Sequence, residues 1–98
     1  MEQSKPHHSL ADVKRLISEG RFFVTRTAFS GANMLGFSLA DILDTAQALE
    51  RRDFYKSMTS HRDHRIWMDV YHPQTSAGPV YLKLTIDDSA VILSFKEL

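Results

Sequence analysis

Two stretches in the first half of the chain carry hydrophobic residues at helical intervals. Spacings of three and four predict an amphipathic helix over residues 10–19 whose apolar face holds Leu10, Val13, Leu16 and Ile17. The same pattern recurs from Leu39 to Leu49 and predicts a second helix over roughly 39–50. Ser9 and Ser38 stand where helix N-caps are expected, each with an aspartate three residues later.

The segment between these two helices has a weaker pattern. Residues 21–25 predict a brief strand, and residues 26–35 predict a helix closed by Gly36. Gly31 lies inside this third helix and argues against it, because glycine disfavours a helix interior.

After Asp53 the hydrophobic period changes from 3.6 to 2. Four runs rich in β-branched and aromatic residues follow one another: DFYKSMT, HRIWMDVY, PVYLKLTI and AVILSF. The connecting segments SHRD, HPQTSAG and DDS are short enough for hairpins or tight loops. The whole pattern predicts one α+β domain over residues 1–98, with N-terminal helices packed on one face of an antiparallel sheet.

Strand alternation indicates which side chains line the face that the helices leave open. In the last two strands the apolar set Val80, Leu82, Leu84, Val91, Leu93 and Phe95 alternates with a more polar set. Tyr81, Lys83 and Lys96 belong to the polar set, so we expect them to share the open face. Both alternating sets in DFYKSMT mix apolar with polar groups, and periodicity therefore leaves the side of Lys56 undecided.

Charge and composition narrow the function only slightly. Lysine plus arginine equals aspartate plus glutamate at 12 each, but residues 51–86 carry six basic and three acidic side chains. This mild local excess fits an RNA-binding track or an ordinary solvated surface equally well. The chain has no cysteine, no apolar run of membrane-spanning length and no signal-peptide pattern, so we expect a cytoplasmic protein.

No motif for a metal or a nucleotide cofactor is present, and none is expected. His61 and His64 could share a metal only if their loop bent both imidazoles inward, and a plain polar turn is the simpler interpretation. His7 and His8 are interpreted as part of an N-terminal tail. The open face offers a stronger candidate, with cations for phosphates and aromatic rings for unpaired bases, although exposed lysines also keep sheet edges unpaired.

Three stretches are specific enough to identify a family. DFYKSMTSHRDHRIWMDVYHP, GPVYLKLTIDDSAVILSFKE and PHHSLADVKRLI closely resemble the MqsR (motility quorum-sensing regulator) family of toxins, nearly from end to end. The resemblance implies a RelE/YoeB-like fold and a ribosome-independent mRNA interferase with a preference for GCU-type sites. It also implies an MqsA-type antitoxin partner, with an N-terminal zinc-binding domain and a helix-turn-helix domain that represses the shared operon.

The resemblance also points to particular residues. It implies that Lys56, Tyr81 and Lys96 are catalytic. The pattern of cations and rings adds Tyr55, Arg65 and Lys83 as candidates for binding RNA, and Met68 is a further candidate. Relatives carry glutamine where this chain has Met68. A thioether donates no hydrogen bond, so this departure suggests altered activity or site preference, or simple packing under a bound base.

A metal-free mechanism suits these side chains. The RNA 2′-hydroxyl would attack the adjacent phosphorus, with Lys56 as the proton-transfer residue, Lys96 on the phosphate, and Tyr81 positioning or protonating a substrate oxygen. The alternative is a catalytically weakened RNA- or protein-binding module that acts mainly through its antitoxin. Direct DNA binding by this chain alone is not expected, because the predicted helix over 39–50 contains no lysine or arginine.

Overall fold

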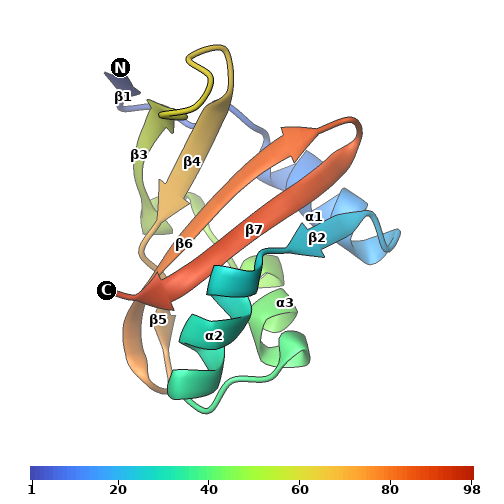
Figure 1. Cartoon of the computed structure of the whole chain (residues 1–98), viewed down its shortest axis with the longest axis vertical. Helices are drawn as coiled ribbons and strands as arrows, with labels where there is room; N and C mark the ends of the chain where they lie inside the picture. The colour runs from blue at the N-terminus through green and yellow to red at the C-terminus, as the bar shows by residue number, and fades with distance from the viewer.

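The computed structural model describes residues 1–98 and contains three helices and a seven-stranded sheet (Figure 1). The helices are α1 (Leu10–Ser18), α2 (Arg26–Met34) and α3 (Leu39–Gln47), and a 3₁₀ turn spans Arg51–Asp53. The strands are β1 (Glu2–Gln3), β2 (Phe22–Val24), β3 (Phe54–Thr59), β4 (Trp67–Tyr71), β5 (Gln74–Thr75), β6 (Gly78–Asp87) and β7 (Ala90–Glu97). This is the α+β fold that the sequence predicts. None of its helices combines the length and the apolar character needed to cross a membrane.

The sheet has the order β1-β3-β4-β6-β7-β2, with β5 paired to β6 outside this path. The four runs predicted as strands form β3, β4, β6 and β7, and consecutive members pair antiparallel. The brief strand predicted over 21–25 is β2, which runs parallel to β7. The segment HPQTSAG, predicted as turn only, contributes the two residues of β5.

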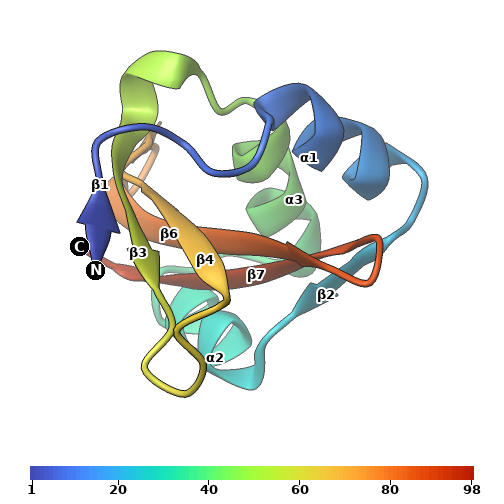
Figure 2. The same cartoon turned by 90° about the horizontal axis from the view of Figure 1, so that it is seen from above.

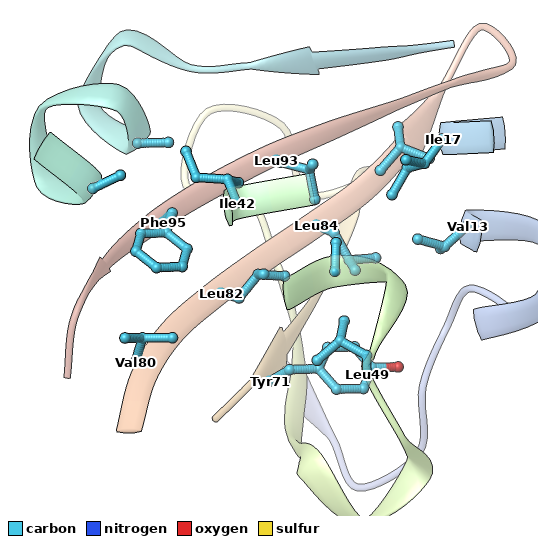
Figure 3. Close-up of a cluster of buried hydrophobic side chains, with 14 of the residues drawn as sticks. Val13, Ile17, Ile42, Leu49, Tyr71, Val80, Leu82, Leu84, Leu93 and Phe95 are labelled. Carbon is cyan, nitrogen blue, oxygen red and sulfur yellow. The ribbon is translucent and has the colours of Figure 1, made fainter. Parts of the chain in front are cut away.

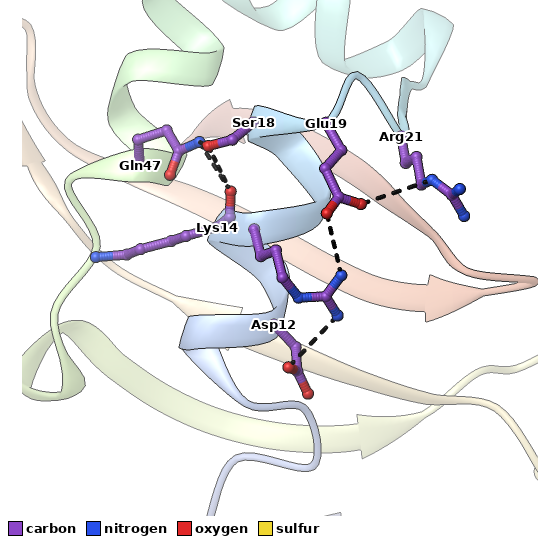
Figure 4. Close-up of polar contacts among 7 residues, drawn as sticks. Asp12, Lys14, Ser18, Glu19, Arg21 and Gln47 are labelled. Atoms are coloured by element: carbon purple, nitrogen blue, oxygen red, sulfur yellow. Dashed lines mark hydrogen bonds and ion pairs between the residues drawn. The ribbon is translucent and has the colours of Figure 1, made fainter.

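Helices α1 and α3 lie together on one side of the sheet (Figure 2). Ser9 caps α1, and Ser38 forms a full capping box with Asp41 at the start of α3, as their spacing predicts. The side-chain amide of Gln47 joins the two helices, because its Nε2 donates to the Lys14 carbonyl and the Ser18 hydroxyl, each at 3.1 Å (Figure 4).

Helix α2 packs beside β7, beyond the point where β2 ends. Gly31 explains how closely the two elements approach: a Cβ atom at this position would lie 2.8 Å from the Phe95 carbonyl oxygen. The predicted helix is therefore confirmed, and its central glycine is required by packing against the strand rather than by helix geometry.

The hydrophobic core lies between the sheet and the helices (Figure 3). It contains the apolar set that alternation assigns to the covered face: Val80, Leu82, Leu84, Val91, Leu93 and Phe95. The helices contribute buried residues from their apolar stripes, and the segment after α3 adds Leu49: Val13, Leu16, Ile17, Ala28, Ala32, Ile42, Ala46 and Leu49. Burial of each large aliphatic side chain contributes about 1.5–3 kcal/mol, so this alternation fixes which sheet face is left open.

The N-terminal segment is not the plain tail that the sequence suggested. Glu2 and Gln3 pair with β3, and the following residues cross β3 and β4 on the helix side of the sheet (Figure 2). The buried carboxylate of Asp69 accepts the backbone N–H groups of His7 at 2.9 Å and His8 at 2.8 Å. A charged acceptor on β4 therefore holds the segment in place, which local composition alone could not reveal.

Candidate functional site

The open face begins with a pair across β6 and β7. Tyr81 and Lys96 are direct cross-strand partners, and the Lys96 Nζ atom lies 4.7 Å from the centre of the Tyr81 ring. Burial raises the pKa of the Tyr81 phenol, so it is protonated and able to donate a hydrogen bond at neutral pH. Lys83 lies on the same face, opposite Ser94, as the alternation predicts.

A β-bulge decides the side on which Lys56 lies. Phe54 pairs with Tyr71 while Lys56 pairs with Val70, so Tyr55 is the extra residue on β3. Val70 is also the partner of Lys83, and residues directly opposite in a sheet share a face. The bulge thus places Lys56 on the open face with Lys83 and leaves Phe54 on the covered face.

A row of three rings crosses this face. The Tyr55 and His72 rings are stacked with centroids 4.2 Å apart, and the His72 and Tyr81 centroids are 5.7 Å apart. The Lys56 Nζ atom lies 5.5 Å from the centre of the Tyr55 ring, at the other end of the row from Lys96. Aromatic rings flanked by cations can hold bases and phosphates together.

Sequence reasoning missed His72, which it assigned to a turn. Continuing the alternation of β4 by one residue past Tyr71 would have placed it on the open face with Val70. Its Nε2 atom is buried and makes no hydrogen bond within the chain.

Next to the rings is a groove of about 520 Å³. It runs from the strands to the start of α2 and is lined by side chains that include Thr25, Arg62, Met68, Tyr81, Lys83 and Lys96. The structure therefore brings Met68 and Lys83 together with two of the predicted catalytic residues. Arg62 lines this groove, whereas Arg65 does not.

Arg65 instead points into its own loop. Its side chain is 90% exposed and forms an ion pair with Asp63 at 3.0 Å. Because the ion pair is exposed, another anion can easily replace Asp63. Arg65 can therefore bind a ligand, but only outside the groove.

Two of the lysines differ in their electrostatic surroundings. The Lys56 Nζ atom forms an ion pair with the Glu2 carboxylate at 2.8 Å, and this hydrogen bond raises the pKa of Lys56. Burial, and secondarily the Lys96 cation, lowers the pKa of Lys83. The two lysine pKa values therefore move in opposite directions, that of Lys83 downward mainly through burial and that of Lys56 upward through Glu2.

A larger hollow, of about 880 Å³, lies between α3 and β5. Its lining includes the carboxylates of Asp41, Asp44, Glu50 and Asp53 and the single basic side chain of Arg52. Because this acidic surface repels phosphates, it is unsuited to RNA binding despite its larger volume. Nowhere in the chain are three or more His, Cys, Asp or Glu side chains grouped to hold a metal ion.

The fold and this face define a small α+β protein with a cationic, aromatic surface suited to a ligand that carries phosphates and bases. Residues 5–97 match the family described as "Motility quorum-sensing regulator, toxin of MqsA". The chain is 43% identical over 97 residues to the mRNA interferase toxin MqsR of Escherichia coli (strain K12), covering 99% of both chains. The chain belongs to the MqsR toxin family. The description of the family as the toxin of MqsA supports an antitoxin partner.

Proposed function

We propose that this chain is the toxin of a type II toxin–antitoxin system and acts as a ribosome-independent endoribonuclease that cleaves mRNA at GCU-type sites and arrests growth. Family membership and the printed activity of the 43% identical relative support the activity. The structural observation that best supports this activity is that Lys56, Tyr81 and Lys96 lie on the same open sheet face.

The proposed chemistry is a metal-free transesterification. The 2′-hydroxyl attacks the adjacent phosphorus, Lys96 holds the phosphate and stabilises the developing charge, and Tyr81 donates a hydrogen bond to a substrate oxygen. Lys56 transfers a proton. In the unliganded protein the hydrogen bond to Glu2 raises the pKa of Lys56, so the side chain is an ammonium when RNA arrives and can protonate the leaving 5′-oxygen.

Four further side chains are proposed to bind the RNA around the cleaved bond. Tyr55 is 56% exposed and presents a ring for stacking, while Lys83 and Met68 line the groove. Arg65 would contact a phosphate farther along the strand, after exchanging its ion pair with Asp63.

The partner is an MqsA-like antitoxin with an N-terminal zinc-binding domain and a C-terminal helix-turn-helix domain, and DNA contacts are assigned to that partner. The absence of lysine and arginine from α3 supports this division, because a recognition helix needs cations for the DNA backbone. The proposed substrate, mRNA, places the protein in the cytoplasm.

A second candidate function is a catalytically weakened RNA- or protein-binding module that works mainly through the antitoxin. Met68 favours it, because the thioether offers no hydrogen-bond donor inside the groove. Growth arrest on expression without the antitoxin separates the two, since the binding module alone would leave growth unaffected.

The deciding experiment is cleavage of a defined, ribosome-free RNA containing GCU sites, in the presence of EDTA, with the cuts mapped by primer extension. We expect cuts at GCU in the wild type and their loss in Lys56→Ala. Lys14→Ala is the matched control, because Lys14 lies on α1, on the covered side of the sheet. Intact RNA from a folded wild-type protein would favour the binding module, and dependence on a divalent metal would reject the metal-free mechanism.

A further inference from the structure

His72 lies at the centre of the proposed site, although neither the proton transfer nor the phosphate binding described above uses it. Its ring is enclosed by Tyr55 at 4.2 Å and Tyr81 at 5.7 Å between ring centroids. Its backbone N–H donates to the Asp53 carbonyl at 2.8 Å, which fixes the chain at the end of β4. The imidazole is therefore held in a defined place among side chains proposed to handle RNA.

The imidazole also has an unused hydrogen-bonding atom. The Nε2 atom is buried, and no group of the chain donates to it or accepts from it. Buried polar atoms in folded proteins nearly always have a partner, and the exceptions call for an explanation such as a catalytic role. Tyr55 is the most exposed ring of the row, so a substrate base stacked on it would bring its ribose close to the imidazole.

We propose that His72 is a further catalytic residue of this site and accepts the proton of the attacking 2′-hydroxyl. The inference rests on the proposed RNA cleavage. As the O2′–P bond forms, the 2′-hydroxyl proton passes to the imidazole. As the P–O5′ bond breaks, the leaving 5′-oxygen takes a proton from the Lys56 ammonium. The products are a 2′,3′-cyclic phosphate and a 5′-hydroxyl, with no oxidant or metal required.

The electrostatic surroundings agree with this division of roles. Burial, and secondarily the Lys56 cation, lowers the pKa of His72, so the imidazole is neutral and able to accept a proton at neutral pH. The charged or titratable groups around it are Tyr55 and Lys56 on β3, Tyr81 on β6, Lys96 on β7, and Glu2 on β1 through its ion pair with Lys56. A neutral base beside a charged lysine supplies the acid and base that the reaction needs.

The test measures single-turnover cleavage of a GCU-containing RNA from pH 5 to 9 by the purified full-length chain. Wild-type cleavage should rise with pH to a plateau, with its midpoint below 6.5, because the imidazole must be neutral. His72→Phe keeps a ring beside Tyr55 but cannot take a proton, so cleavage should fall by roughly 10²–10⁴-fold and the rising limb should disappear. Binding of a non-cleavable 2′-deoxy analogue should change by less than a few-fold.

His61→Gln is the matched control, since His61 is an exposed histidine in the β3–β4 loop and lies outside the site. It should keep both the rate and the pH profile. A His72→Ala variant leaves space between the two tyrosines, and added imidazole should restore part of its cleavage, an effect that a merely structural role cannot produce.

Specific results would overturn the proposal. One is a His72→Phe variant that cleaves RNA within a few-fold of the wild-type rate and keeps the rising limb of the pH profile. The other is a His72→Phe variant that loses RNA binding and cleavage to the same extent. If His72→Phe does not fold, the folded His72→Ala variant decides: the proposal is overturned if added imidazole does not restore its cleavage. These failures require an active wild type. A wild type that cleaves no RNA overturns the proposed function itself, and the two failures are thereby distinguished.

Discussion

Tyr81 on β6 and Lys96 on β7 face each other directly across the sheet, with the ammonium 4.7 Å from the centre of the phenol ring. The ring is half-buried while Lys96 is exposed, so the cation meets solvent and the phenol lies beneath it. A phosphate bound by Lys96 would therefore lie next to a protonated hydroxyl. The two side chains combine charge with a directed hydrogen bond.

Tyr81→Phe tests the hydroxyl while keeping the ring beneath Lys96. We expect cleavage to fall by roughly 10²–10⁴-fold, the range for a lost proton-transfer or hydrogen-bond donor, with RNA affinity nearly unchanged. Single-turnover kinetics and binding of a 2′-deoxy analogue measure the two effects separately. Tyr71→Phe is the matched control on the covered face, and equal activity of both variants would exclude a role for the Tyr81 hydroxyl.

Glu2→Gln removes the carboxylate that neutralises Lys56 in the unliganded protein. An RNA phosphate must displace this carboxylate, and an exposed ion pair contributes little free energy, so we expect RNA to bind only a few-fold more tightly. The measurement is a titration with the 2′-deoxy analogue at low salt. Glu19→Gln, whose carboxylate lies at the end of α1 near Arg15 and Arg21 (Figure 4), should leave affinity unchanged. Weaker binding by Glu2→Gln would show that β1 supports the site structurally instead.

The sequence predicted the strands, the helices and the open face because each depends on a short repeating pattern. Tyr81, Lys83 and Lys96 could be assigned to one face because β6 and β7 alternate without interruption. Lys56 could not be assigned, because the bulge at Tyr55 interrupts the alternation of β3 and is fixed only by pairing with β4. The ion pair between Glu2 and Lys56 joins residues 54 positions apart, and nothing local encodes it.

His72 shows a different limit of sequence reasoning. Pro73 follows it and is typical of a turn, so the sequence predicts a turn at His72, which lies directly after the end of β4. Its importance depends on Tyr55 and Tyr81, which come from two other strands. Similarly, the N-terminal segment looks like a tail until Asp69, about sixty residues later in the chain, is seen to accept its backbone N–H groups.

Met68→Gln tests the departure that the family resemblance implies at this position. Met68 lines the groove with Tyr81 and Lys83, and an amide there can donate and accept hydrogen bonds to RNA. One added hydrogen bond is worth about 0.5–1.5 kcal/mol, so we expect cleavage to increase roughly 2- to 10-fold, with cuts mapped by primer extension to reveal any change in preference. Met58→Gln is the matched control, because Met58 is the cross-strand partner of Met68 but lies outside the groove. If both substitutions increase cleavage equally, the increase comes from a more polar sheet face and not from a contact inside the groove.

Tyr71→Phe should stabilise the fold, most clearly in alkali. The Tyr71 hydroxyl is buried without a hydrogen-bond partner, so its removal should raise the free energy of unfolding at pH 7 by about 1 kcal/mol. Burial, with the Asp69 carboxylate as the second cause, raises the pKa of Tyr71 to about 12 from an ordinary value of 10. In wild type the unfolded chain therefore ionises first, and stability present below pH 10 is lost as the pH rises towards 12.

Urea unfolding at pH 7 and pH 11 measures both effects of this substitution. The Tyr71→Phe protein lacks the ionisable phenol and should lose less stability between the two pH values than wild type. Tyr55→Phe is the control, because it removes a phenol that is exposed in the folded protein, and it should leave the alkaline loss unchanged. An equal alkaline loss in wild type and Tyr71→Phe would mean that the buried phenol gains a partner in solution, and the surface opening beside Arg51 and Tyr71 would be the route by which water reaches it.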